Sequence, residues 1–382
     1  MRSENPATGP NPGDRPEIVC RVARFLEDPA AEAFDLLARD AWAFQVERIP
    51  AHRGLARARE VDPRRVRSWR GVPPVPALAY KSVAVALPEA EAGAAGPAVE
   101  TFRSSGTTGG PRSVHRHPFP GLYRAVIDAS FPHFCLRDAA GRGFPGRPPA
   151  LSLVPPRATL PDSSLSFMVE HVVDRWSDPE ASAWAFAAGP GQEGLDEATA
   201  EGWARARQRD GRPGLVLATA FALSAWLDRL EEAGERLRLP AGTTLFETGG
   251  FKGRGRELTR QELLRRVEER LGVPPERVVR EYGMTELTSQ LYTDVLAGGD
   301  PDLFVAPHWV RVRVLDPETL EEAPPGTPGL IAIFDLANLS SAVHVLTEDL
   351  GATEPEGLRL LGRAAGAELR GCSLAAEELT GR

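Results

Sequence analysis

Three short apolar segments between residues 214 and 286 constrain the fold more than any other feature of the chain. LVLAT (215–219), TTLFE (243–247) and VVREY (278–282) have the length and the apolar, β-branched content of buried strands. Helix-length segments separate them, which gives the order β-α-β-α-β. This order predicts an α/β fold with a parallel sheet flanked by helices.

The two intervening segments carry clear helix signals. The second begins with a capping box, Thr259-x-x-Glu262, and Gly272 stands just past its end. In the first segment, apolar residues recur at helical spacing at Leu223, Trp226, Leu227 and Leu230. Both segments are therefore predicted to be amphipathic helices packed on the sheet.

The remaining chain is organised differently on either side of this segment. Residues 17–70 have a mixed apolar pattern that indicates helices, and residues 138–161 are rich in Gly, Pro and Arg and indicate a loop. After residue 308, WVRVRVL, GLIAIFDL and SAVHVLTED read as short strands. We expect them to form a small β-rich unit.

A run of small polar residues, RSSGTTGG (103–110), follows a predicted strand, AVETF (98–102). Its glycines let the backbone approach a ligand closely, and its amides and hydroxyls suit the oxygens of a polyphosphate. A flexible surface turn is the alternative, and the residues alone leave both open. A Walker A sequence is absent, and the G-x-G-x-x-G match at 189–194 is interpreted as coincidental because a poor strand precedes it.

The composition excludes several classes of protein. A formal net charge of −8 argues against a dedicated nucleic-acid binder, which needs a basic face. The three cysteines are too few and too scattered for a disulfide framework or a zinc site, so we expect a cytoplasmic protein. The longest apolar stretch, around residues 215–227, is too short to span a bilayer.

Five short motifs occur in the order seen in adenylate-forming enzymes: SSGTTGG (104–110), TGGFKG (248–253), YGMTE (282–286), TED (347–349) and GR (362–363). Within that superfamily, the chain resembles the LuxE-type acyl-protein synthetases of bacterial fatty-acid reductase systems. GGFKG in place of the usual Gly-Gly-Ala-Pro and RGCSL near the end match that family. The resemblance covers residues 70–382 and implies a large AMP-binding domain, with parallel sheets flanked by helices and a small β-rich subdomain.

By this resemblance, the Ser/Thr/Gly loop closes over the β- and γ-phosphates of ATP. Arg112 departs from the family pattern, since many relatives have Lys there, and it keeps the charge without the flexible point donor. The residues to which the resemblance assigns phosphate binding are Ser104, Ser105, Gly106, Thr107, Thr108 and Gly109.

The resemblance also implies an adenosine site at the strand ends. Tyr282 is expected to stack on adenine, with Gly249 and Gly250 forming a flat backbone face on the other side. Asp349 resembles the acid that takes the ribose hydroxyls, and Arg363 the contact from the hinge region. Because ligands bind beyond the carboxyl ends of parallel strands, the glycines and Tyr282 should lie near each other.

The reacting end of the site is expected at the tip of the third strand, where Gly283 and Met284 lead into Thr285 and Glu286. The resemblance makes Thr285 a contact to the reacting phosphate and Glu286 the ligand of Mg²⁺, which prefers oxygen ligands. Most of the superfamily supplies a late lysine from a C-terminal domain, which we expect to be truncated here. Lys252, one of only two lysines, is therefore the candidate contact to the acyl-adenylate oxygens.

Four further side chains stand out. The family carries its acyl group on a cysteine in the region of Cys372, and a thiolate is a strong nucleophile near neutral pH. Lys81, the other lysine, is expected to buttress either the Ser/Thr/Gly loop or an acyl pocket, and the sequence does not decide between them. His115 and His117 follow the loop, and because no third ligand is visible we interpret them as non-metal.

We therefore divide the chain into a disordered tail (1–16), a catalytic domain (17–362) and a short C-terminal segment (363–382) carrying the candidate cysteine. The predicted function is a ligase that activates a carboxylic acid, expected to be a fatty acid, as acyl-AMP with pyrophosphate release. The acyl group then passes to a cysteine thiol, and a reductase or carrier protein is the expected partner. An acyl- or aryl-CoA ligase similar to phenylacetate–CoA ligases and a non-catalytic nucleotide-binding protein are the alternatives.

Overall fold

The computed structural model of the protein describes residues 16–83, 85–88, 99–104, 111–138, 142–144, 146–187, 194–249 and 259–364. The helices within these residues are α1 (Glu17–Glu27), α2 (Phe34–Arg48), α3 (Pro50–Ala58), α4 (Pro120–Cys135), α5 (Ser164–Trp176), α6 (Glu197–Asp210), α7 (Ala220–Glu232) and α8 (Arg260–Leu271). The strands begin with β1 (Val75–Pro76), β2 (Glu100–Arg103), β3 (Val114–His117), β4 (Ala150–Ser152), β5 (Ala183–Trp184), β6 (Phe186–Ala187), β7 (Gly194–Leu195) and β8 (Leu215–Thr219). They continue with β9 (Thr244–Thr248), β10 (Val278–Tyr282), β11 (Leu291–Thr293), β12 (Leu303–Val305), β13 (Val310–Leu315), β14 (Gly329–Asp335), β15 (His344–Glu354) and β16 (Gly357–Arg363).

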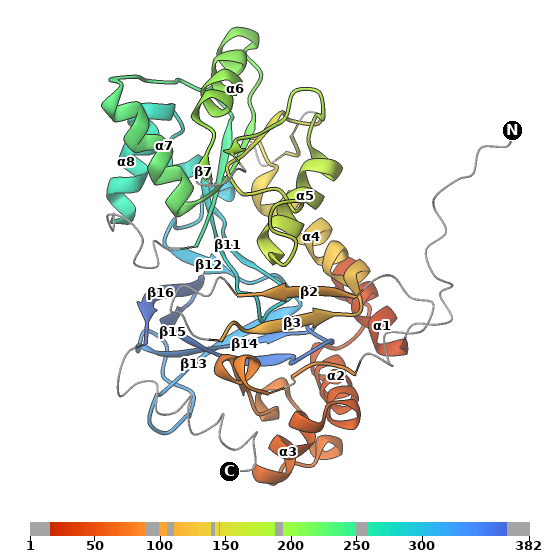
Figure 1. The fold of residues 1–382 in the computed structure, drawn as a ribbon. Coiled ribbons are helices and arrows are strands. Elements are labelled where there is room, and N and C mark those ends of the chain that lie inside the picture. The colour runs from red at the N-terminus through yellow and green to blue at the C-terminus, as the bar shows by residue number, and fades with distance from the viewer. Residues whose placement is uncertain are drawn as a thin grey trace, which may run out of the picture.

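One half of the main sheet is parallel, in the order β5-β4-β8-β9-β10. Both faces of its central strands are buried, which explains their continuous apolar sequences. Leu215 and Leu217 of β8 pack with helices α4 and α5, whereas Val216 and Ala218 pack with α7 and α8. Figure 1 shows α7 and α8 on one side of these strands and α4 and α5 on the other. The predicted α/β fold with a helix-flanked parallel sheet is confirmed.

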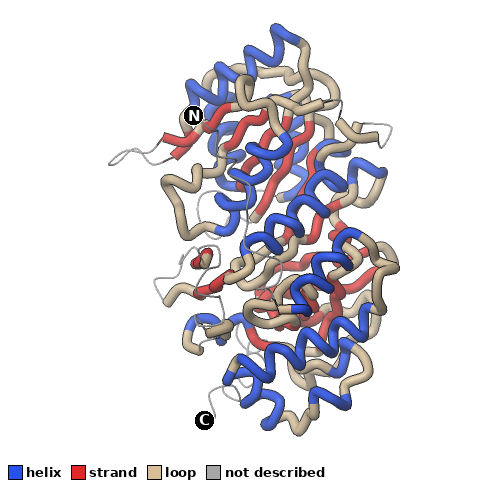
Figure 2. The backbone as a smooth tube through the Cα atoms, turned by 90° about the vertical axis from the view of Figure 1, so that its right-hand side faces the viewer, coloured by secondary structure: helices blue, strands red, loops and turns tan. Residues whose placement is uncertain are grey.

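The other half of the sheet is antiparallel and continues from β10 through β11, β12, β16, β15 and β14 to β13. The strands predicted after residue 308 are therefore present. They do not form a sheet of their own, because β12 hydrogen-bonds to β16 and joins both halves. In Figure 2, helices lie over the strands of both the upper and the lower part of the molecule.

A separate two-stranded hairpin, β2 and β3, lies beside the sheet junction, and Arg103 is paired with Val114 next to the Ser/Thr/Gly loop. Below it, helices α1–α3 pack on the antiparallel half. The core at this contact contains Trp42 and Leu37 from α2 together with Ile331, Ile333 and Phe334 from β14. The hairpin thus lies outside the main sheet, beside the junction of its two halves.

The ends of helix α8 were predicted correctly from the sequence, whereas the short strand β4 was not. Thr259 caps α8 by accepting a hydrogen bond from the Glu262 amide, and Gly272 ends this helix in the left-handed conformation, as expected. The prediction of a loop over 138–161 was wrong in its middle, because Ala150–Ser152 forms β4 between β5 and β8. A strand of three residues within a Pro- and Gly-rich stretch has no local signature, and its pairing partners lie far along the chain.

The predicted division into a tail, a catalytic domain and a C-terminal segment stays a prediction. The residues predicted as a disordered tail lie outside the described part of the chain, apart from Pro16, and so do those after Ala364. Strand β16 runs to Arg363, across the expected boundary after residue 362. None of the described helices combines the length and the apolar character needed to cross a membrane.

Candidate functional site

The motif-bearing residues meet where β9 and β10 end. The two strands are parallel neighbours, and Glu281 of β10 pairs with Thr248 of β9. Gly249 follows β9 directly with a φ of 75°, a conformation that glycine adopts without strain. Just past the end of the neighbouring strand β10, a Cβ atom at Gly283 would collide with the Glu281 carboxylate. The predicted proximity of Gly249 to the segment that begins at Tyr282 is confirmed.

The hairpin β2–β3 brings the base of the Ser/Thr/Gly loop to the same place. The Ser104 hydroxyl accepts a hydrogen bond from the Ser113 amide, at 2.9 Å, and the Ser104 amide donates to the Ser113 carbonyl, at 3.1 Å. Arg112 donates to the carbonyls of Ser104 and Arg103 and pairs with Asp162 at 2.9 Å. Arg112 thus links the end of β2 to Asp162 at the base of the loop, a role that the sequence did not indicate.

Two neutral side chains hold the main chain of the segment that follows β10. His115 Nδ1 lies 2.6 Å from the Thr285 carbonyl oxygen, and the Asn338 amide donates to the Glu286 carbonyl at 2.9 Å. Because a carbonyl only accepts, His115 carries its proton on Nδ1, and its Nε2 accepts from the Ser341 hydroxyl at 2.8 Å. Burial lowers the pKa of His115 to about 4, so it is neutral near pH 7.

The turn beyond Glu286 is fastened to the end of β14. Asp335 accepts hydrogen bonds from the Thr288 amide at 3.1 Å and from the Ser289 amide and hydroxyl at 2.7 Å each. Burial raises the pKa of Asp335, and these hydrogen bonds oppose the rise. Since Asp335 and Asn338 both lie in or beside the β14–β15 connection, that connection supports the turn bearing Glu286.

Glu286 itself is only 6% exposed. Burial raises the pKa of its carboxyl group, while the Ser113 hydroxyl and the positive charge of Lys81 oppose the rise, and the negative charge of Glu348 adds to it. A desolvated carboxylate of this kind is stabilised by a cation. Among the described residues, no group of three or more His, Cys, Asp or Glu side chains could hold a metal by itself.

A chain of charged groups extends from Glu286 toward the predicted ribose site. Lys81 lies 3.7 Å from Glu348, and Arg363 lies 3.7 Å from Glu348 and 3.6 Å from Asp349. The Tyr282 hydroxyl donates to Asp349 at 2.7 Å. These contacts bring the predicted residues Tyr282, Asp349 and Arg363 together.

Tyr282 is largely buried in the structure, with its ring centroid 5.9 Å from that of Phe304. Met284 packs against the core beside it. The remaining predicted site residues lie outside the described part of the chain: Ser105, Gly106, Thr107, Thr108, Gly109, Gly250, Lys252 and Cys372. Their roles stay predictions.

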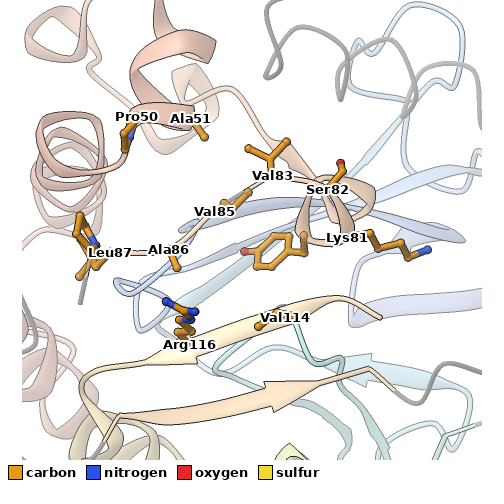
Figure 3. Close-up of a pocket in the computed structure, with 12 residues that line it drawn as sticks. Pro50, Ala51, Lys81, Ser82, Val83, Val85, Ala86, Leu87, Val114 and Arg116 are labelled. Carbon is orange, nitrogen blue, oxygen red and sulfur yellow. The ribbon is translucent and has the colours of Figure 1, made fainter. Parts of the chain in front are cut away.

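A pocket of about 750 Å³ adjoins this site. It is lined by residues of the segment from Tyr80 to Leu87 and by Pro50 and Ala51 of α3. Figure 3 shows Val114 and Arg116 of strand β3 opposite the part of this segment from Lys81 to Leu87. Tyr80 belongs to both the pocket and the site, because its hydroxyl donates to the Ser341 hydroxyl at 3.0 Å and to the Glu286 carbonyl at 3.4 Å. Lys81 also lines the pocket, which the sequence alone left undecided.

The fold resembles that of adenylate-forming ligases. A crystal structure of 2-hydroxyisobutyryl-CoA ligase, in an open conformation with 2-HIB-AMP and CoA, superposes with a TM-score of 0.59 at 16% identity, over 91% of this chain and 69% of that one. ATP-bound MatB from Rhodopseudomonas palustris gives a TM-score of 0.45 at 18% identity, over 69% of this chain and 47% of that one.

The particular family is indicated by the second half of the chain. Residues 220–380 match the family model described as acyl-protein synthetase, LuxE. A curated relative, the long-chain-fatty-acid–luciferin-component ligase of Vibrio harveyi, is 29% identical over 107 residues. That match spans 26% of this chain and 27% of the relative. The predicted resemblance to LuxE-type acyl-protein synthetases is thus confirmed over this part of the chain.

Proposed function

We propose that the protein is an ATP-dependent acyl-protein synthetase that activates a carboxylic acid and then holds its acyl group on a cysteine. The observation that carries this proposal is the meeting of buried Glu286, the base of the Ser104–Ser113 loop and the Tyr282–Asp349 pair on an adenylate-forming fold. The family match over residues 220–380 supports the same activity. By the name of the curated relative, the proposed acid is a long-chain fatty acid.

The residues present fit a magnesium ion at Glu286. Its carboxylate is desolvated, carries a raised pKa because of burial, and offers the oxygen ligand that Mg²⁺ prefers. When bound, the ion would neutralise charge on the phosphate oxygens. Thr285 would contact the reacting phosphate, and His115 and Asn338 keep both residues in place through their carbonyls.

In the proposed first step, a carboxylate oxygen of the acid attacks the α-phosphorus of ATP. The bond from that phosphorus to the oxygen bridging to the β-phosphate breaks, and its electron pair leaves with pyrophosphate. Asp349, oriented by the Tyr282 hydroxyl, would hold the ribose, and Lys252 would contact the oxygens of the adenylate. Alignment and charge neutralisation, rather than covalent help from the protein, would accelerate this step.

In the proposed second step, the thiolate of Cys372 attacks the acyl carbonyl carbon after its proton has passed to solvent. The carbon–oxygen bond to AMP breaks, AMP leaves with the electron pair, and a thioester remains. A reductase or carrier protein would then accept the acyl group. A cytoplasmic location belongs to this proposal because thioester chemistry needs a reduced thiol.

One experiment tests both steps. With tetradecanoate, ATP, Mg²⁺ and radiolabelled pyrophosphate, wild type should catalyse ATP–pyrophosphate exchange. With radiolabelled tetradecanoate, ATP and Mg²⁺, it should acquire a label that hydroxylamine removes. Glu286→Gln should abolish exchange, whereas Glu268→Gln, on the exposed side of α8, should not. Lys252→Ala should slow exchange sharply.

The thiol assignment has its own matched control. Cys372→Ser should retain exchange but lose the label, and Cys20→Ser, at an exposed cysteine, should keep both. Full labelling of Cys372→Ser would refute the second step. Release of AMP only in the presence of coenzyme A would favour the acyl-CoA ligase instead.

A further inference from the structure

We propose that the pocket between the Tyr80–Leu87 segment and β3 holds the apolar tail of the acid, with the carboxylate at its Lys81 end. This inference rests on the proposed function and adds to it the place of the substrate. The pocket volume of about 750 Å³ is in the range of sites that enclose small organic ligands.

The lining has the chemistry of an acid with an apolar tail. Val83, Val85 and Leu87 come from one wall, and Val114 comes from β3 opposite them. Apolar walls favour an alkyl chain because its burial removes apolar surface from water. The charged side chains on the same pocket are cationic, Lys81 and Arg116, which matches the negative charge of a carboxylate.

The pocket is continuous with the residues proposed to act on ATP. Tyr80 lines it and donates to the Glu286 carbonyl at 3.4 Å. Lys81 lines it and acts electrostatically on the Glu286 carboxylate. Strand β3 separates the two regions at this point, because Val114 lines the pocket from one face and His115 holds Thr285 from the other. An acid whose tail fills the pocket therefore presents its carboxylate to the reacting end of the site.

The Lys81 ammonium group is positioned for this task. It lies 3.7 Å from Glu348, which keeps it at the junction of the pocket and the site, and its side chain remains about one-third exposed. A carboxylate reaching this point gains a cationic partner at the place where it must approach the α-phosphate. Figure 3 shows the Lys81 amine at one end of the row of lining residues, with Leu87 at the other.

The test fills the pocket by substitutions at partly exposed positions that line it. Ala86 lines the pocket and is half-buried, so Ala86→Trp adds an indole where the tail would lie. Ala23→Trp is the matched control, because Ala23 is also half-buried and lines the smaller pocket between α1 and α4. Val83→Phe provides a second filling variant, and melting temperatures verify that each variant is folded.

Two readouts are compared for hexanoate, decanoate and tetradecanoate: the KM of each acid in ATP–pyrophosphate exchange, and its Kd by calorimetry without ATP. Ala86→Trp and Val83→Phe should raise the KM and the Kd for tetradecanoate at least tenfold, which corresponds to about 1.4 kcal/mol of binding free energy. The same two constants for hexanoate should rise less than twofold. Lys81→Gln should weaken the binding of all three acids by the same factor, because the Lys81 side chain acts on the carboxylate that they share. Ala23→Trp should match wild type.

The outcomes separate this inference from the proposed function. If wild type exchanges and folded Ala86→Trp and Val83→Phe keep its chain-length profile, the pocket does not hold the tail. If wild type fails to exchange with any acid while calorimetry shows tetradecanoate binding that Ala86→Trp weakens, the pocket assignment stands and the proposed activity falls. The assignment is also overturned if Ala86→Trp and Val83→Phe weaken the binding of all three acids by the same factor.

Discussion

Asn338 offers the sharpest test of how the Glu286 turn is held. Its side-chain amide is fully buried and donates to two main-chain carbonyls, that of Glu286 at 2.9 Å and that of Ala342 at 2.7 Å. Its amide oxygen accepts from the Thr288 hydroxyl at 3.0 Å. The substitution Asn338→Asp keeps the shape of the side chain but replaces the donating group with an oxygen that cannot donate when ionised.

The expected cost follows from these contacts. A buried carbonyl that loses its donor costs about 1–3 kcal/mol. The Glu286 carbonyl keeps the contact from the Tyr80 hydroxyl at 3.4 Å, so the two losses together cost up to about 6 kcal/mol of unfolding free energy. The charge of the new carboxylate faces two carbonyl oxygens and adds to this cost. Because a protonated carboxyl group can donate once, the difference from wild type should shrink as the pH falls.

Urea unfolding, followed by fluorescence over a range of pH, measures this difference. The matched control is Gln208→Glu, the same exchange of amide for acid on the exposed surface of α6, which should change stability by less than about 0.5 kcal/mol. We also expect Asn338→Asp to lower the affinity for Mg–ATP more than the control does. A stability loss no larger than that of the control would refute the reasoning.

Three further predictions follow from single contacts. Tyr282→Phe removes the donor to Asp349 and should cost about 1–3 kcal/mol in urea unfolding; an unchanged midpoint would contradict that contact. Arg112→Gln should speed amide hydrogen exchange in β2 and β3 while costing less than about 1 kcal/mol overall, because Arg112 is 39% exposed; unchanged exchange would argue against its role at the loop base. Burial lowers the pKa of His52 to about 4, against 6.5 when unfolded. As the pH falls, His52 therefore takes up a proton in the unfolded chain before it does so in the folded protein. Stability should fall between pH 6.5 and about 4, and His52 should contribute at most roughly 3 kcal/mol to this loss. His52→Gln should lose this part of the acid sensitivity, and an identical pH profile in the variant would contradict it.

The parallel segment was predictable because its signals are local. Strands β8, β9 and β10 are buried on both faces, and such strands carry continuous apolar sequences. A capping box and a left-handed glycine mark the ends of α8. Once three parallel strands are recognised, their carboxyl ends must share one edge of the sheet, so the proximity of Gly249 and Tyr282 followed from the order of elements alone.

The sequence by itself thus determined the class of fold and the edge of the sheet at which its motifs meet. The tertiary structure decided which neutral side chains hold that edge: His115 contacts Thr285 from 170 residues away, and Asn338 contacts Glu286 from 52 residues away. It also decided that β4 forms within a Pro- and Gly-rich stretch and that Lys81 lines a pocket beside Glu286. The physical reason is range, since propensities and caps act over a few residues, whereas hydrogen bonds between distant segments exist only after the chain has packed.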